Sequence, residues 1–268
     1  MKKIYPIVIS RLLLVVMISI NYGNDTENYI ISKDGNRIAY SVEGHGFPDI
    51  IFVHGWLGDQ TSWSNQKKYF SKNHRVITLD LVGFGKSGNK RDKWTMEAFG
   101  EDVKLVIEHL NVKKAVLVGH SMGSAVIIEV AMQMPNIIIG LVPVDVFHNV
   151  EQNFTPEQIE YEIERRMFLV EDRLIANPSK AEYKTGWIAS LAEYFKWRSN
   201  SLTINLEALK IPITCINSDR KPSDIEMARK YTSSFDVKIV KGVGHGVMVE
   251  KHDLFNRLLT KIISTTSD

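Results

Sequence analysis

The chain has 268 residues, of which 44% are hydrophobic and 24% are charged, a balance that excludes a disordered or fibrous protein. Its formal net charge is +2, and no long run of one sign stands out, so nothing indicates a nucleic-acid partner. The single cysteine, Cys215, excludes an internal disulfide and a cysteine-based metal site. Its apolar neighbours predict a small buried residue of a strand.

The first 23 residues form a segment of their own. Lys2 and Lys3 resemble the positive start of a signal peptide, and residues 12–20 are an apolar run of the matching length. Arg11 interrupts the apolar stretch, which disfavours a full membrane span. We therefore expect residues 1–23 to be a signal peptide or an uncleaved N-terminal anchor. The protein would then be periplasmic, secreted or associated with a membrane.

After this segment, short apolar runs alternate with amphipathic helical patterns. The first two strands form a hairpin around a turn at 34–36. Strands are predicted at 29–32, 37–43, 49–54, 75–80 and 115–119, within 137–146, and at 211–216 and 237–240. Helices are predicted at 61–70, 96–110, 121–134, 223–231 and 250–263. Continuous apolar strands separated by helices indicate a mostly parallel sheet that helices cover on both faces.

Residues 148–210 interrupt the alternation, because they have helical character, many aromatic side chains and no strong strand. A helix start is predicted at 153–156 and a helix break at 177–179. We therefore predict an α/β core formed by residues 24–147 and 211–268, into which residues 148–210 are inserted as a helical cap.

The motif Gly-His-Ser-Met-Gly at 119–123 fits the pattern G-x-S-x-G, and it lies between an apolar strand and a helix. In this context a serine sits on a sharp, strained turn that exposes its hydroxyl above the sheet. Small flanking residues relieve crowding at the turn. The helix that follows directs its N-terminal amides toward a developing oxyanion. The pattern predicts that Ser121 is a catalytic nucleophile.

A second motif, His-Gly-Trp at 54–56, follows the strand at 49–54. Such a turn brings a backbone N–H near the nucleophile, so the amides of Trp56 and Met122 are the predicted oxyanion hole. We interpret His54 as a structural residue, because it lies at the end of a strand within the turn.

The general base must come late in this topology. His245 lies in the glycine-rich loop at 242–246, directly after the last strand, from which a histidine can reach Ser121. A neutral imidazole there can accept the serine proton and later return it to the leaving group. Glu250, just past this loop, is expected to help start the final helix rather than to act in catalysis.

Two aspartates compete for the role of orienting His245. Asp219 follows the strand at 211–216, and Asp145 ends the preceding strand. Both positions are carboxyl ends of strands, where an open α/β sheet places its site. The order Ser, Asp, His and the place before a helix favour Asp219, and Asp145 stays as the alternative acid.

With these motifs, and with the loop Asp-Leu-Val-Gly-Phe-Gly-Lys-Ser at 80–87, the chain resembles the α/β-hydrolase superfamily from about Tyr29 onward. The resemblance implies the α/β-hydrolase fold with a mostly parallel eight-stranded sheet. It is closest in kind to the branch of esterases, lipases and C–C hydrolases that carry a helical cap. Two positions depart from the pattern: Ser124 replaces a frequent second glycine, and Ile216 replaces a glycine often found three residues before the acid.

Other motifs fail on their context. The run at 83–88 matches G-x-G-x-x-G, but a charged loop follows where a dinucleotide site needs a helix. The run Gly-Lys-Ser at 85–87 lacks the first glycine of a P-loop, because Asp80 stands there. Asp80 and Ser87 are instead expected to hold this loop by local hydrogen bonds. The histidines show no metal-like grouping, so we predict no metal and no cofactor.

The sequence therefore predicts a serine hydrolase that cleaves a small to medium carboxylic ester through an acyl-enzyme. No stable protein partner is inferred. Two alternatives stay open: C–C bond hydrolysis or lyase chemistry on the same scaffold, and a small-molecule receptor with low turnover. The predicted pocket residues, besides the oxyanion residues, are Phe147, Phe168, Trp187 and Trp197.

Overall fold

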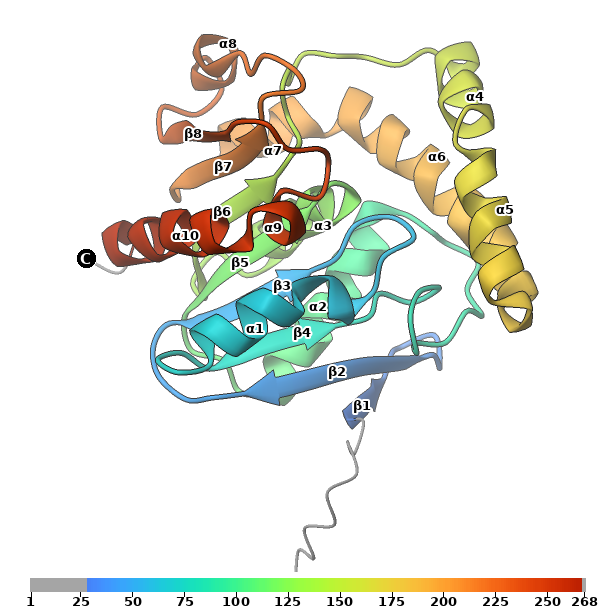
Figure 1. Cartoon of the computed structure of the whole chain (residues 1–268), viewed down its shortest axis with the longest axis horizontal. Coiled ribbons are helices and arrows are strands. Elements are labelled where there is room, and N and C mark those ends of the chain that lie inside the picture. Colours follow the sequence, from blue (N-terminus) through green and yellow to red (C-terminus); the bar gives the residue numbers. More distant parts are fainter. Residues whose placement is uncertain (1–27, 267–268) are drawn as a thin grey trace, which may run out of the picture.

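The computed structural model describes residues 28–266, so the predicted export segment at 1–23 lies outside the described residues. An eight-stranded sheet runs through the described part in the order β1-β2-β4-β3-β5-β6-β7-β8 (Figure 1). Its strands are β1 (Asn28–Ile31), β2 (Arg37–Glu43), β3 (Asp49–Val53), β4 (Val76–Leu79), β5 (Ala115–His120), β6 (Ile138–Val144), β7 (Ile213–Ser218) and β8 (Phe235–Val240). β2 pairs antiparallel with β1 and β4, and the other neighbours are parallel. The mostly parallel sheet is confirmed.

The antiparallel edge begins with the predicted hairpin. Gly35 has a φ of +79° between β1 and β2, a left-handed conformation that glycine adopts without strain. The Ser32 amide donates to the Asn36 carbonyl oxygen at 2.8 Å, which closes the turn. Local turn chemistry therefore sets the register of the first strand pair.

Helices cover both faces of the sheet, as the pattern predicts. One face is packed by α1, α9 and α10, and the other by α2 and α3. The core helices are α1 (Ser64–Phe70), preceded by the short η1 (Gln60–Trp63), α2 (Met96–His109), α3 (Met122–Gln133), α8 (Ile225–Arg229), α9 (Val247–Glu250) and α10 (His252–Thr266). None of the helices within residues 28–266 is long and apolar enough to cross a membrane.

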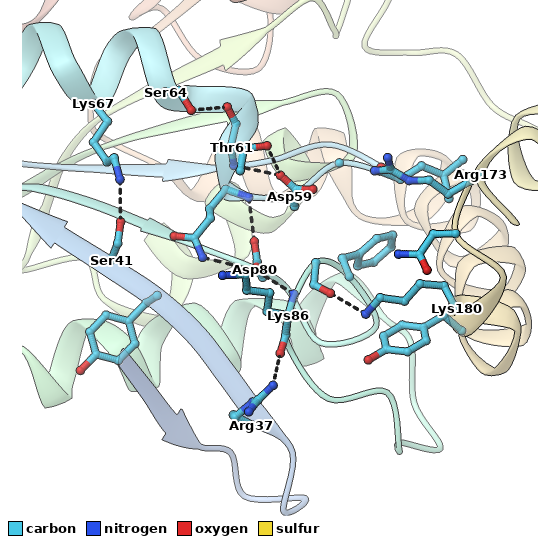
Figure 2. A pocket seen from close by; sticks show the side chains of 18 of the residues that line it. Arg37, Ser41, Asp59, Thr61, Ser64, Lys67, Asp80, Lys86, Arg173 and Lys180 are labelled. Carbon is cyan, nitrogen blue, oxygen red and sulfur yellow. Dashed lines mark hydrogen bonds between the residues drawn. The ribbon is translucent and has the colours of Figure 1, made fainter. Parts of the chain in front are cut away.

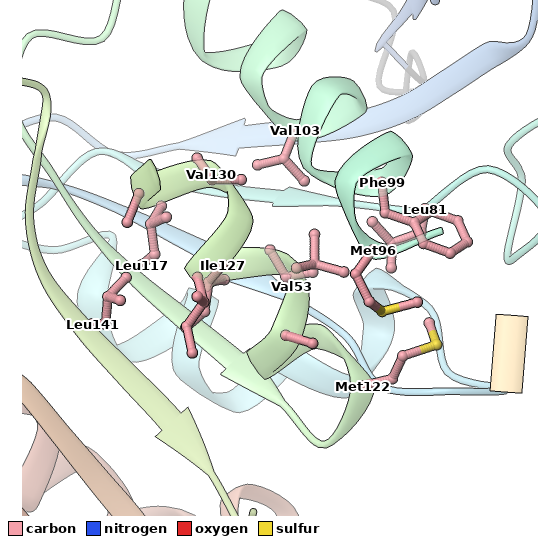
Figure 3. Close-up of a cluster of buried hydrophobic side chains, with 14 of the residues drawn as sticks. Val53, Leu81, Met96, Phe99, Val103, Leu117, Met122, Ile127, Val130 and Leu141 are labelled. Carbon is pink, nitrogen blue, oxygen red and sulfur yellow. The ribbon is translucent and has the colours of Figure 1, made fainter. Parts of the chain in front are cut away.

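The central strands are buried on both faces, which explains why their sequences are continuous apolar runs. In β3, Ile51 and Val53 point into the cluster under α2 and α3, whereas Ile50 and Phe52 point into the cluster under α1 and α10. Figure 3 shows the first cluster, with Val53 beside the side chains of α2 and α3. The period-two alternation of a strand thus supplies both layers of the core.

The helical insertion lies between β6 and β7, where the sequence predicts it. It consists of α4 (Pro156–Glu164), α5 (Met167–Ala176), η2 (Pro178–Tyr183), α6 (Lys184–Asn200) and α7 (Leu202–Ala208). Thr155 begins α4 with a capping box to Gln158 and with Pro156 in the first turn, the helix start predicted at 153–156. The predicted break at 177–179 separates α5 from η2.

The cap rests on the core through α6 and α7, which pack on α3 (Figure 1). Glu129 of α3 is buried there, and its Oε1 accepts hydrogen bonds from the Trp197 indole at 2.6 Å and the Asn205 amide at 2.7 Å. Burial raises the pKa of the Glu129 carboxyl, although both donors act against the rise. One core carboxyl group therefore joins two cap helices.

Candidate active site

Ser121 lies between β5 and α3 with a φ of 52° and a ψ of −116°, a left-handed conformation unusual for a residue with a side chain. Such strain costs on the order of 1–3 kcal/mol and persists only where the surroundings impose it. The neighbouring glycines allow the turn, because a Cβ at Gly119 would collide with the Gly123 carbonyl group, and a Cβ at Gly123 with the His54 carbonyl group. The local geometry is that of the nucleophile elbow.

Ser124, a departure from the family pattern, is buried within this turn. Its hydroxyl donates to the Gly119 carbonyl oxygen at 2.6 Å and lies 3.4 Å from the Val144 amide. The substitution therefore adds a hydrogen bond across the elbow and leaves the turn intact. The Ser121 amide also donates to the Val144 carbonyl oxygen at 3.0 Å, which ties the elbow to β6.

The His-Gly-Trp turn packs directly against the elbow. A Cβ at Gly55 would lie 3.3 Å from the Ser121 Cβ and 2.7 Å from His120 Nδ1, so only glycine fits beside the serine. The next residue, Trp56, is thus close to the elbow through its backbone, and its indole N–H donates to the Trp187 carbonyl oxygen at 2.7 Å. Met122 is the first residue of α3, and its N–H is one of the amides that a helix start leaves unpaired.

His54 is buried and uses both ring nitrogens in the fold. The Leu81 amide donates to Nε2 at 3.0 Å, so Nδ1 carries the proton and donates to the Gly55 carbonyl oxygen at 2.8 Å. Burial lowers the pKa of this histidine, which favours the neutral ring. The structural interpretation of His54 agrees with these contacts.

His245 lies in the loop between β8 and α9, and its side chain is 46% exposed. Glu250 holds this loop, since its carboxylate accepts the amides of Gly244 at 2.8 Å and Gly246 at 3.3 Å on either side of the histidine. The carbonyl oxygen of His245 accepts a hydrogen bond from His120 Nε2 at 2.9 Å, and the two rings lie 4.5 Å apart. The histidine that flanks the serine in sequence therefore contacts the loop of His245.

Nδ1 of His245 lies 2.6 Å from Oδ2 of Asp145, whose side chain is fully buried. Asp145 follows β6 directly and has a φ of 50°. Oδ1 accepts the Ser218 amide at 2.8 Å and the Ser218 hydroxyl at 2.6 Å. Burial opposes ionisation of Asp145, but the hydrogen bonds from His245, Ser218 and Arg220 outweigh it and hold its pKa well below the usual range.

The preference for Asp219 is wrong for the pairing with His245. Asp219 is exposed, and its Oδ1 accepts the Gly242 amide at 2.9 Å, so it holds the start of the histidine loop. The reason lies in the strand order: β6 is the direct neighbour of β5, which carries Ser121, whereas β7 lies one strand further away. The carboxylate at the end of β6 is therefore the one that reaches the histidine.

Arg220 is a site residue that the sequence interpretation missed. Its Nη2 donates to Oδ2 of Asp145 at 2.8 Å, the same oxygen that accepts the proton of His245. Nη2 also lies 3.3 Å from His245 Nδ1, a contact between two donor groups. A basic residue next to Asp219 was the available signal, but only the placement of β7 beside β6 shows which carboxylate it serves.

Two more histidines surround the pair. Burial, together with the nearby His245, lowers the pKa of His120 to about 3, so this ring stays neutral. His148 Nε2 lies 3.7 Å from Oδ1 of Asp145, and His148 Nδ1 lies 3.1 Å from the Ser223 hydroxyl. Burial also lowers the pKa of His148. Asp145 thus has two histidines beside it, and only His245 is within hydrogen-bond distance.

No hydrogen bond joins the Ser121 hydroxyl to His245 within residues 28–266. Catalytic hydrogen bonds are often long before substrate binds and shorten in the complex with substrate. The elbow, the histidine loop and Asp145 nevertheless lie together. His120, which precedes Ser121, contacts His245, and His245 contacts Asp145. The arrangement provides a serine hydroxyl on a strained turn, an imidazole with a fixed tautomer and a buried carboxylate.

The predicted pocket residues are scattered. Phe168 lies on α5 with 57% of its surface exposed, and its place in a substrate pocket stays a prediction. Phe147 and Trp197 are buried, with ring centroids 6.5 Å apart, and the Trp197 indole is bound to Glu129. Trp187 is also buried, and its indole N–H donates to the Gly83 carbonyl oxygen at 2.7 Å. Phe147, Trp187 and Trp197 therefore join the cap to the core.

Residues singled out for other chemistry have structural contacts. Asp80 accepts the Gln60 amide at 2.7 Å, and the Ser87 hydroxyl donates to the Asp80 carbonyl oxygen at 2.6 Å, so both hold their loop as predicted. Cys215 is fully buried, and burial raises the pKa of its thiol. Within the described part of the chain, no group of three or more histidine, cysteine or acidic side chains could hold a metal ion.

The fold and the nucleophile elbow together indicate an α/β hydrolase, and sequence comparison shows the same family. Residues 48–239 match the family model described as alpha/beta hydrolase fold, so the chain belongs to the α/β-hydrolase family. A bifunctional esterase/perhydrolase of Acinetobacter calcoaceticus is 35% identical over 123 residues, which are 43% of this chain and 45% of that protein. A putative esterase/lipase of Haemophilus influenzae is 33% identical over 98 residues, 37% of this chain and 34% of that protein. The chain thus matches less than half the length of these curated relatives.

Solved structures resemble the chain over most of its length. A thermophilic esterase from Thermogutta terrifontis has a TM-score of 0.72 at 23% identity, with 90% of this chain and 98% of that chain covered. The epoxide hydrolase CorEH has a TM-score of 0.70 at 18% identity, with 90% and 99% covered. Identities this low show the shared fold alone, and that fold serves several chemistries.

Proposed function

We propose that the protein is a serine carboxylesterase that acts on small to medium esters through an acyl-enzyme intermediate. The observation that carries this proposal is the pairing of His245 Nδ1 with the buried Asp145 at 2.6 Å, beside a serine in a strained elbow. A carboxylate on Nδ1 leaves Nε2 as the basic nitrogen that can accept a proton from serine. The esterase names of several relatives support ester substrates.

In the first half-reaction, His245 Nε2 takes the Ser121 hydroxyl proton while Oγ attacks the ester carbonyl carbon. The carbonyl π electrons move to oxygen, and the amides of Trp56 and Met122 stabilise the resulting oxyanion. The tetrahedral intermediate then collapses, the C–O bond to the alcohol breaks, and His245 gives its proton to the departing alkoxide. Ser121 is left as an acyl ester.

In the second half-reaction, His245 removes a proton from water, and the hydroxide attacks the acyl carbon. Collapse of the second tetrahedral intermediate releases the carboxylic acid, and the proton returns to Ser121 Oγ. Asp145 stays ionised throughout, because its hydrogen bonds hold its pKa well below the usual range. Its charge stabilises the imidazolium that forms in each step.

The test uses p-nitrophenyl acetate and p-nitrophenyl butyrate with the wild-type chain, Ser121→Ala and Ser64→Ala. We expect turnover by wild type, loss of about 10³-fold or more in Ser121→Ala, and unchanged turnover in Ser64→Ala, which alters an exposed serine away from the elbow. A fluorophosphonate probe should label Ser121 in wild type. Absence of both turnover and labelling in folded protein would refute the proposal.

A further inference from the structure

A cavity of about 1130 Å³ opens between the cap and the loops that follow β3 and β4 (Figure 2). Its walls come from β1, β2, the loop at 57–59, η1, α1, the loop at 80–86, α5, η2 and α6. Ser121, His245 and Asp145 are not among the described residues that line it. The volume is slightly above the usual range of small-molecule sites, about 300–1,000 Å³. The cleft therefore does not contain the three catalytic candidates, although Trp187, one of the predicted substrate-pocket residues, lines it.

Besides Lys67 and Lys86, three basic side chains from three segments line the cleft: Arg37 of β2, Arg173 of α5 and Lys180 of η2. Arg37 donates to the Lys86 carbonyl oxygen at 2.9 Å, Lys180 donates to the Gly85 carbonyl oxygen at 2.6 Å, and Arg173 donates to a carbonyl oxygen of the core. Among residues 28–266, no ion pair joins any of the three to a carboxylate. Neutral carbonyl groups orient these side chains but leave their positive charges uncompensated.

The acidic residues of the same cleft are engaged elsewhere. Glu43 forms an ion pair with Lys67 at 2.8 Å. Asp80 is buried and accepts the Lys86 backbone amide at 2.9 Å. Asp59 is the N-cap of η1. Asp59 and Asp80 keep their negative charges, but within residues 28–266 none of these carboxylates forms an ion pair with the three basic side chains. The five basic and three acidic residues that line the cleft therefore give it a net charge of +2.

We propose that this cleft binds a small anion that carries two or more carboxylate or phosphate groups. A guanidinium has five N–H donors in a planar fork that matches both kinds of anion. Arg37 and Arg173 each use Nη2 for a carbonyl oxygen and keep donors for a ligand. Both side chains belong to exposed residues, so a ligand can reach them from solvent. Lys180, which also lies 3.8 Å from the Tyr183 ring centroid, adds a third charge.

The test is isothermal titration calorimetry of the full chain with citrate and with pyrophosphate at about 20 mM ionic strength, where charge interactions are little screened. We expect saturable binding of at least one of the two, and the preferred one identifies carboxylate or phosphate as the ligand group. The double variant Arg173→Gln/Lys180→Gln should bind at least roughly tenfold more weakly. Arg37→Gln should weaken binding as well, which keeps the test informative if the double variant folds poorly.

Lys67→Gln is the matched control, because Lys67 lines the same cleft but its charge is paired with Glu43. Its affinity should change less than about twofold. Two results would overturn the proposal: no saturable binding of either anion by the folded wild-type chain, or an equal loss in Lys67→Gln, which would show attraction to general surface charge. The binding readout needs no catalysis, so it is independent of the esterase proposal.

Discussion

At the scale of single residues, Asp145 and Asp219 have separate structural tasks. Asp145 is buried and contacts His245 Nδ1, whereas Asp219 is exposed and accepts the amide of Gly242. An asparagine at 145 removes the negative charge that stabilises the imidazolium and can present an N–H to Nδ1, which selects the wrong tautomer. An asparagine at 219 keeps an oxygen that can accept the same amide. The two substitutions should therefore differ widely in effect.

We expect Asp145→Asn to lower kcat for p-nitrophenyl acetate by roughly 10³- to 10⁴-fold, and Asp219→Asn to lower it less than about threefold. Steady-state kinetics measures both, and thermal unfolding of each variant checks that it is folded. The opposite pattern, with a large loss only in Asp219→Asn, would show that the histidine is oriented differently during catalysis.

Arg220 adds a second donor to the oxygen of Asp145 that His245 uses. It fixes the carboxylate and favours its ionised form, so its removal should act on the chemical step more than on substrate binding. We expect Arg220→Gln to lower kcat roughly threefold to tenfold with little change in KM. Arg220→Lys should restore part of the loss, because one charged donor is kept.

The control for Arg220 is Lys221→Gln, which removes the next exposed positive charge in the chain. Because no hydrogen bond of Lys221 reaches Asp145 in the described part of the chain, kcat should stay within about twofold of wild type. Equal losses in the two variants would mean that general positive charge near the site, rather than the bond to Asp145, supports the reaction.

At the scale of elements, local patterns predicted most of the fold. The β3 and β5 strands are continuous apolar runs because both of their faces are buried. Thr155 and Pro156 predict the start of α4, because a capping threonine and a first-turn proline are typical of helix N-termini. Ser121 was found for the same reason, since its elbow depends on neighbours in sequence. Element ends shifted by a few residues, as at β8, which begins at Phe235 rather than Val237.

The partner of His245 was not predictable in this way, because it depends on strand order. An aspartate follows both β6 and β7, and nothing local shows which strand adjoins β5. The role of Arg220 was not predictable for the same reason, since its contact with Asp145 spans 75 positions of the chain. The sequence does not fix the orientation of Phe168 either, because an aromatic residue on an amphipathic cap helix can face either side, and here it is exposed.

Glu129 offers a test of how the cap is joined to the core. Both the Trp197 indole and the Asn205 amide donate to Oε1 alone, so a glutamine at 129 can accept both bonds with its single oxygen. A leucine can accept neither and leaves two donors without partners. We expect Glu129→Leu to lower the free energy of unfolding by about 1–3 kcal/mol, measured by urea denaturation, and Glu129→Gln to be close to wild type or more stable at pH 7.

The sign of the pH dependence follows from the raised pKa of Glu129. The protonated form is favoured in the folded state, so its stabilising contribution is present below the unfolded pKa. It is lost as pH rises through the folded pKa. Glu129→Gln has no such group, and the difference in unfolding free energy between glutamine and wild type should therefore grow in favour of glutamine from pH 4 to pH 7. A constant difference over this range would show that the carboxyl does not titrate as its burial implies.

At the scale of the whole molecule, the hydrolase core and the N-terminal segment are separate parts of the sequence. The described residues 28–266 form a sheet, its covering helices and a cap that rests on α3. The apolar run at 12–20 precedes β1 in the sequence, and the turn residues of the hairpin that β1 opens close it.

We propose that residues 1–23 direct export. The test is to express the full chain with a C-terminal tag in a Gram-negative host and to locate it by cell fractionation. Lys2 and Lys3 followed by the run at 12–20 have the charge and length of an export signal, and a charge within the run raises the free energy of its insertion by about 2.5–3.5 kcal/mol. Wild type should be found in the periplasm, medium or membrane fraction, and Leu14→Arg should stay in the cytosol. Thr26→Arg, which adds the same charge outside the run, should be exported like wild type. Mass spectrometry of the N-terminus then distinguishes a cleaved signal from an anchor, and a wild-type chain confined to the cytosol with an intact N-terminus would refute export.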